Sequence, residues 1–172
     1  MDKRFNEKLA EEAKRAGICR EWYGKILQAA DIPQLLALYV SGIDFCLSNE
    51  YPNNRILKEY GGEYLPAFGI YVDEENAELQ NPRRLIALGT TRAAATFREY
   101  AMGEVFAKHS AEVAVSAQNN SFVVIDMFDE SRVTVKAFGN AKVCIHQYGG
   151  TLSTESAQSA VIKVIDKHKT TY

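Results

Sequence analysis

A ten-residue repeat in the C-terminal half constrains the fold of this chain more than any other feature. Cut into tens from residue 91, the sequence has apolar residues at the third, fifth and seventh positions of most blocks. The recurring apolar sets are Val113, Val115 and Ala117, then Val123, Ile125 and Met127, then Val133, Val135 and Ala137. Strict alternation predicts β-strands with one buried face. Turn-forming residues such as Asn119-Asn120 and Gly149-Gly150 end the blocks.

The parity of these apolar positions distinguishes two arrangements. In an antiparallel meander with a two-residue turn at Asn119-Asn120, Ser116 would pair with Val123, so odd residues of one strand would share a face with even residues of the next. The apolar residues are odd-numbered on both strands, so a meander needs a bulge in every hairpin to keep one core. In a parallel solenoid each residue stacks on the residue twenty positions later in the next coil. The two side chains lie on the same face, so odd apolar positions on both strands form one core. We therefore predict a parallel β-solenoid over residues 83–172, with about 20 residues per coil and about four coils.

Alternate strands of this solenoid differ on their outward face. Even positions are mostly polar in the blocks that start at residues 111, 131 and 151, which is typical of a face in water. In the other blocks the even positions are more apolar, namely Phe122, Val124, Phe128, Cys144, Tyr148, Ile162 and Val164. Strands that are apolar on both faces belong to a sheet covered on both sides. We expect the N-terminal helices, or a second protomer, to cover this face.

Residues 1–62 carry the pattern of short amphipathic helices. Their apolar stripes are led by Phe5, Leu9, Trp22, Leu35 and Tyr39. Asp31-Ile-Pro-Gln34 resembles a capping box and predicts the start of a helix that continues to Cys46. Short helices with one apolar stripe need a surface to cover. The predicted fold class is therefore α+β: a helical region, a connector over residues 63–82, and the solenoid, which folds with the helices as one cooperative unit.

Charge and cysteine content narrow the classes of function. Twenty basic residues against 22 acidic ones give a net charge of −2, which provides no bulk field for nucleic acid or an anionic membrane. No apolar run approaches the ~18 residues of a membrane span, and the N-terminal segment lacks the apolar core of a signal peptide. Cys19, Cys46 and Cys144 have no metal-ligand spacing. We expect a cytoplasmic protein without a cofactor, nucleic-acid partner or membrane partner.

Two columns of residues are candidate binding sites. Asp126, His146 and Asp166 are spaced by one coil, which predicts a stack with ~4.8 Å between neighbours. Such a stack could bind a metal ion, but we favour a structural role in which the imidazole lies between two carboxylates. The second column contains Phe128, Tyr148 and His168, and could bind a sugar or a protein partner or stabilise the ladder. We expect no metal at either column and find no catalytic motif.

The segments GICREWYGKI, GIDFCLSNEYP and VKAFGNAKVCI resemble a bacterial family of gut anaerobes with an N-terminal helical region and a C-terminal β-repeat. That family has no assigned activity, so the resemblance implies a fold and no functional residue. The repeat is also similar to bactofilin-type and adhesin-like β-helices, which are structural or self-associating. We therefore expect a non-enzymatic structural or protein-interaction protein, of phage or mobile-element origin. The alternative is a carbohydrate-binding or carbohydrate-active β-helix protein.

Overall fold

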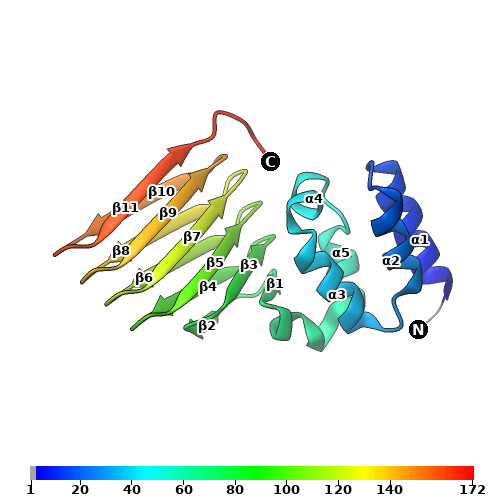
Figure 1. Ribbon diagram of the computed structural model, residues 1–172, viewed down its shortest axis with the longest axis horizontal. Helices are drawn as coiled ribbons and strands as arrows, with labels where there is room; N and C mark the ends of the chain where they lie inside the picture. The colour runs from blue at the N-terminus through cyan, green and yellow to red at the C-terminus, as the bar shows by residue number, and fades with distance from the viewer. Residues whose placement is uncertain (1–2) are drawn as a thin grey trace. The chain divides into compact units, whose positions relative to one another are not determined.

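The computed structural model describes residues 3–172 of the chain (Figure 1). The chain forms two compact units: a helical unit that ends at Phe68 and includes Tyr172, and a β unit from Gly69 to Thr171. The predicted α+β class is therefore confirmed. In the described part of the chain, no helix combines the length and the apolar character needed to cross a membrane. Packing of the helical unit on the solenoid stays a prediction.

The helical unit is built from short segments. They are α1 (Lys3–Arg15), α2 (Arg20–Gln28), α3 (Ile32–Ser41), α4 (Ile43–Ser48) and α5 (Asn54–Ile56), followed by a π-helical turn (Leu57–Gly61) and a 3₁₀ segment (Gly62–Phe68). At the start of α3, the Asp31 side chain accepts a hydrogen bond from the backbone N–H of Gln34 at 2.9 Å. The Gln34 side chain in turn accepts one from the backbone N–H of Ala30 at 3.0 Å. These bonds confirm the predicted cap, but Gly42 divides the expected helix into α3 and α4.

The β unit is a parallel solenoid made of two sheets. Its strands are β1 (Ile70–Val72), β2 (Ala77–Gln80), β3 (Arg84–Leu88), β4 (Arg92–Phe97), β5 (Met102–Ala107), β6 (Glu112–Ala117), β7 (Phe122–Met127), β8 (Arg132–Ala137), β9 (Lys142–Gln147), β10 (Thr151–Ser156) and β11 (Val161–Asp166). Sheet A has the order β1-β3-β5-β7-β9-β11, and sheet B has the order β2-β4-β6-β8-β10. Eleven strands at two per coil give about five coils, seen as successive rungs in Figure 1.

The register of the inner coils confirms the predicted solenoid. Val113 pairs with Val133 in sheet B, and Val123 pairs with Val143 in sheet A, both in parallel strands. Odd-numbered side chains fill the space between the sheets, where Val135 is fully buried. This single core is what the shared parity of the blocks required.

A large side chain compensates for the smallest residue of this core. Gly103 occupies an inward position of β5, and a Cβ there would lie 2.2 Å from a ring atom of Phe97. Phe97 is itself fully buried and fills the space that Gly103 leaves. The pair shows that the interior is packed by complementary volumes across the coil.

The first coil of the solenoid lies in the segment that the sequence analysis assigned to a connector. Ile70 pairs with Ile86, and Ala77 pairs with Ala93, so this coil is sixteen residues long. A search for a ten-residue repeat does not detect a coil of that length, because its strands and turns are shorter. The solenoid therefore has about five coils rather than the predicted four.

The last coil departs from the repeat by a single residue. Thr151 pairs with Arg132, and Ile162 pairs with Val143, an offset of nineteen. The shortening occurs at Gly149-Gly150, where Gly150 has φ of 82° and a Cβ would lie 2.3 Å from the Ser131 carbonyl oxygen. Only glycine fits such a crossing without strain.

This shortening reverses the faces of β10 and β11. Leu152 is opposite Val133, and Val164 is opposite Ile145, so even-numbered residues now point toward the core. The assignment of Ile162 and Val164 to the outward face of the sheet was therefore wrong. The outward positions of β11 are instead odd-numbered, with Val161 55% exposed.

We expect Val135→Asp to abolish cooperative folding, because Val135 is fully buried and an unpaired carboxylate there costs several kcal/mol. The matched control is Thr134→Asp, since Thr134 is exposed on the other face of the same strand. Its unfolding free energy should change by less than about 0.5 kcal/mol. Urea unfolding followed by circular dichroism measures both. Equal losses would mean that the faces of β8 are reversed.

Candidate functional site

The candidate binding residues lie on the outward side of sheet A and in the turns that follow its strands. Asp126 on β7 is directly opposite His146 on β9, as the sequence predicted. The His146 Nδ1 atom is 2.7 Å from Asp126 Oδ1. Asp126 is only 8% exposed, and its column continues with Phe106 on β5 and Ile165 on β11. A buried carboxylate between apolar neighbours thus has a close imidazole partner.

Asp166 does not belong to this column, contrary to the prediction. It is opposite Gln147, because the last coil is one residue short, and Ile165 is the residue opposite His146. Asp166 Oδ1 accepts a hydrogen bond from the backbone N–H of His168 at 2.8 Å and lies 3.3 Å from His168 Nδ1. The expected three-residue stack is therefore one Asp126–His146 pair plus a separate exposed pair.

Cys144 extends the buried pair into a row of three groups. Its Sγ atom is 3.8 Å from His146 Nε2, because residues two apart on a strand share a face. A thiol, an imidazole and a carboxylate in this order resemble the arrangement of a cysteine nucleophile and its base. The sequence analysis found no metal-ligand spacing at Cys144 and grouped it with the outward apolar residues, although its position two residues before His146 was the available signal.

The surroundings of this row limit its chemistry. The backbone of β9 is paired with β7 on one side and with β11 on the other. Its N–H groups are therefore used within the sheet and do not converge on Cys144 as an oxyanion hole. The row can hold and orient a thiol, and the paired backbone of β9 does not supply the converging donors that acyl transfer requires.

The aromatic column is closed by lysine side chains. The rings of Phe128 and Tyr148 stack with centroids 4.7 Å apart and an interplanar angle of 18°. Lys108 Nζ lies 5.7 Å from the Phe128 centroid, and Lys167 Nζ lies 5.7 Å from that of Tyr148. Cations over both rings stabilise such a stack. Phe128 has no exposed surface, so a sugar cannot stack on it.

His168 is not the third member of this column. Lys167 donates its backbone N–H to the Gln147 carbonyl at 3.0 Å, so Lys167 rather than His168 follows Tyr148 in the next coil. The cause is again the coil of nineteen residues. Of the six predicted binding residues, the structure brings together Asp126 with His146 and Phe128 with Tyr148, and it pairs Asp166 with His168 outside both columns.

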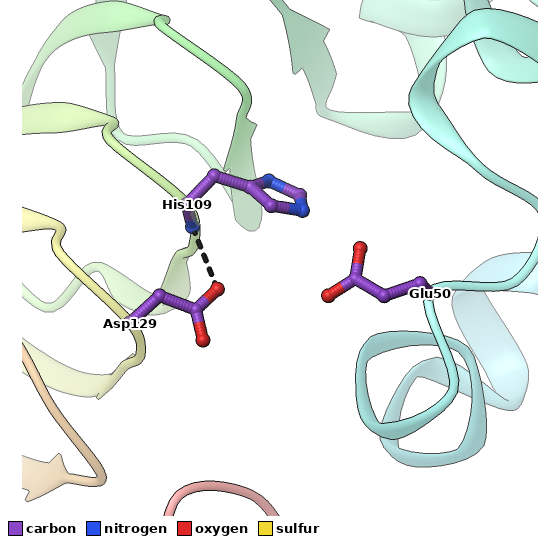
Figure 2. Close-up of side chains that lie close together, drawn as sticks. All are labelled: Glu50, His109 and Asp129. Atoms are coloured by element: carbon purple, nitrogen blue, oxygen red, sulfur yellow. Dashed lines mark hydrogen bonds between the residues drawn. The ribbon is translucent and has the colours of Figure 1, made fainter.

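His109 and Asp129, drawn in Figure 2, connect successive turns of the solenoid. Asp129 Oδ2 accepts a hydrogen bond from the backbone N–H of His109 at 3.1 Å and one from Lys108 Nζ at 2.9 Å. His109 Nδ1 accepts one from the backbone N–H of Gly89 at 3.0 Å. Glu50, the other residue drawn, belongs to the helical unit. Within the solenoid these two side chains act as braces between turns.

The C-terminal coil is the open end of the solenoid. Within the described residues, β10 and β11 are the last strands of their sheets and each has a neighbour on one side only. Val164 is 45% exposed, whereas Ile145 below it in the same column is fully buried. Val161 donates its backbone N–H to the carbonyl of Ala141, just before β9, and Lys167 donates to that of Gln147 at the end of β9. The N–H groups of the even-numbered residues of β11 therefore face the open edge.

Neither protein families, nor curated proteins, nor solved structures give a match to this chain. The resemblance to a family of gut anaerobes and to bactofilin-type β-helices is therefore not confirmed and stays a hypothesis. The structure supports its coarser content, which is a set of N-terminal helices followed by a parallel β-solenoid.

We expect His146→Ala to destabilise the protein by about 1–3 kcal/mol, because it leaves the buried Asp126 carboxylate without its imidazole partner. The matched control is His168→Ala, which removes a histidine from the exposed pair and should change stability by less than about 0.5 kcal/mol. Asp126→Ala combined with His146→Ala should cost less than the sum of the single changes. Urea unfolding of the wild type, the three single variants and the double variant measures these differences. Additive losses would show that the pair does not interact.

Proposed function

We propose that this chain is a non-enzymatic structural protein of the cytoplasm that self-associates through the C-terminal coil of its solenoid. The observation that carries this proposal is the pair of open strand edges on β10 and β11. Unpaired edges readily add another strand. The Asp126–His146 pair and the stacked rings of Phe128 and Tyr148 are bonded within the solenoid, which favours a bracing role for them.

A second copy of the chain is the partner that fits this end. A single added peptide strand would cover one edge only, whereas the same coil of another copy offers two edges with the same separation. A two-fold axis parallel to the strands places β10 of each copy on β11 of the other in antiparallel orientation. An interface of this kind uses the same surface on both subunits and closes at a dimer.

Charge supports this pairing. Glu155 points outward from β10 and Lys163 points outward from β11. A register that places Glu155 opposite Lys163 of the second copy also places Thr154 opposite Val164, so inward residues meet inward residues. The two-fold axis gives two equivalent ion pairs between Glu155 of one copy and Lys163 of the other. Glu155 is accessible for this contact, since its side chain is 62% exposed beside Lys136.

The polarity of the last coil favours a reversible dimer over a permanent one. Thr154 and Ser156 follow Val135 and Ala137 in their columns, and Asp166 follows Gln147. These polar side chains can bind water when the end is uncovered, and a polar outer face is what the terminal repeats of solenoids require. We therefore expect monomer and dimer in equilibrium rather than fibres.

We expect multi-angle light scattering to detect a species of twice the 19.2 kDa chain mass, increasing with protein concentration. Lys163→Glu and Glu155→Lys should each dissociate this species by placing like charges opposite each other. The double variant should restore it. Lys142→Glu is the matched control, since Lys142 lies on the outward face of β9, one coil from the edge.

A wild-type chain that stays monomeric at its highest soluble concentration would refute this assembly. A dimer that Lys163→Glu and Lys142→Glu weaken equally would place the interface elsewhere.

A further inference from the structure

The helical unit contains a cleft that the proposed assembly does not use. Its volume is about 370 Å³, and α1, α2, α3, α4 and the turn Leu57–Gly61 line it. This volume falls within the range of sites that bind small molecules, and well-packed interiors hold few voids of such size. The short helices therefore leave a cleft between their apolar faces.

Most of the cleft is apolar, and its polar groups are few. Leu9, Ile26 and Leu36 are buried residues of its wall. Trp22 and Phe45 are half-buried and also line it, so aromatic faces are available to a ligand. Small-molecule sites typically combine such a wall with a small number of placed polar groups.

The Tyr39 hydroxyl is the polar group that points to a ligand. Tyr39 lines the cleft and is only 6% exposed. Among the described residues no hydrogen bond to its hydroxyl is present, whereas the hydroxyl of neighbouring Tyr51 donates to the Leu9 carbonyl at 2.9 Å. The Tyr39 oxygen is not among the fully buried unpartnered atoms, so it can be reached from the cleft that the residue lines. A ligand in the cleft could therefore bond this hydroxyl in place of water.

The charge of the cleft selects the kind of ligand. Asp44, an exposed residue, is the one acidic side chain among the described lining residues, which include no lysine, arginine or histidine. Burial raises the pKa of the Cys46 thiol to about 12 and holds the pKa of Tyr39 well above its ordinary value. Both groups are therefore neutral near pH 7. An anionic ligand would lie near the Asp44 carboxylate, whereas Lys25 Nζ, 4.9 Å from the Trp22 centroid, is already paired with Glu21 at 2.7 Å.

We propose that this cleft binds a neutral apolar molecule of about two to three rings, or an acyl chain of similar volume, with one hydrogen-bonding group that meets the Tyr39 hydroxyl. The aromatic faces of Trp22 and Phe45 contact the apolar part. The Asp44 carboxylate at the cleft disfavours carboxylates, sulfonates and phosphates. The site lies within one unit and does not depend on self-association through the other.

Two fluorescent probes with the same rings test this proposal on the full chain. N-phenyl-1-naphthylamine is neutral, and 8-anilino-1-naphthalenesulfonate adds one sulfonate. We expect the neutral probe to bind at one per chain and the sulfonate to bind at least about tenfold more weakly. Asp44→Asn should leave the affinity for the neutral probe unchanged and raise the affinity for the sulfonate toward that value.

Two changes locate the probe in the cleft. Tyr39→Phe keeps the ring and removes the hydroxyl that would bond the ligand. It should weaken binding of the neutral probe about fivefold. Ile18 is a half-buried residue of the cleft lining, so the larger side chain in Ile18→Trp should fill the cleft and prevent binding. As an independent readout, the bound neutral probe should slow alkylation of Cys19, an exposed cleft residue, and leave Cys144 in the β unit unaffected.

Several outcomes would overturn the proposal. They are absence of binding to the folded chain, equal affinity for both probes, and binding that neither Tyr39→Phe nor Ile18→Trp reduces. Far-UV circular dichroism of each variant confirms folding. If Ile18→Trp does not fold, the responses of Tyr39→Phe and of Cys19 alkylation decide the outcome.

Discussion

The stacking of each residue on its counterpart one coil away is the constraint on which the solenoid depends. Parallel pairing holds Val113, Val133 and their equivalents at one position in successive coils, so all side chains of a column share one face. Coil length must therefore stay constant to the residue. Turn residues in the left-handed region, such as Asn119 and Asp129, keep it so. Their side chains also bind the previous turn, since Asn119 Oδ1 accepts a hydrogen bond from the Glu99 backbone N–H at 3.2 Å.

Both departures from that length occur at the ends of the ladder, where they can be tolerated. The loss of a single residue from a coil inside the stack would reverse every later face and divide the core, because the apolar positions of the following blocks would point outward. At the last coil, the loss of one residue at Gly149-Gly150 instead changes only β10 and β11. It turns Leu152 and Ile162 toward the core and moves polar Thr154 and Ser156 into the other inward positions of β10. The end is thus partly apolar and partly hydrated, which suits a surface that is exposed in the monomer.

The odd parity of the apolar positions predicted the two parallel sheets. It could not show which coil is one residue shorter than the others. The odd apolar positions of the inner blocks determine parallel pairing, and that part of the fold follows from sequence. Gly149-Gly150 has the composition of any other turn, so Asp166 and His168 were assigned to columns that they miss by one residue. The signal was present in the even-numbered apolar residues Ile162 and Val164, which were interpreted as an outward face. The cleft is harder to predict, because amphipathic stripes indicate which residues face inward and not how completely they fill the interior.

Polar groups have different surroundings in the solenoid and in the cleft of the helical unit. In the solenoid, Asp126 and Asp129 have close partners on neighbouring coils, so these groups contribute rigidity. In the helical unit, the Tyr39 hydroxyl lines the cleft and no described residue hydrogen-bonds it. Its oxygen is not among the fully buried unpartnered atoms, so a molecule in the cleft can reach it. A group that is bonded on both sides braces a fold, whereas a hydroxyl that lines a cleft is available to a ligand.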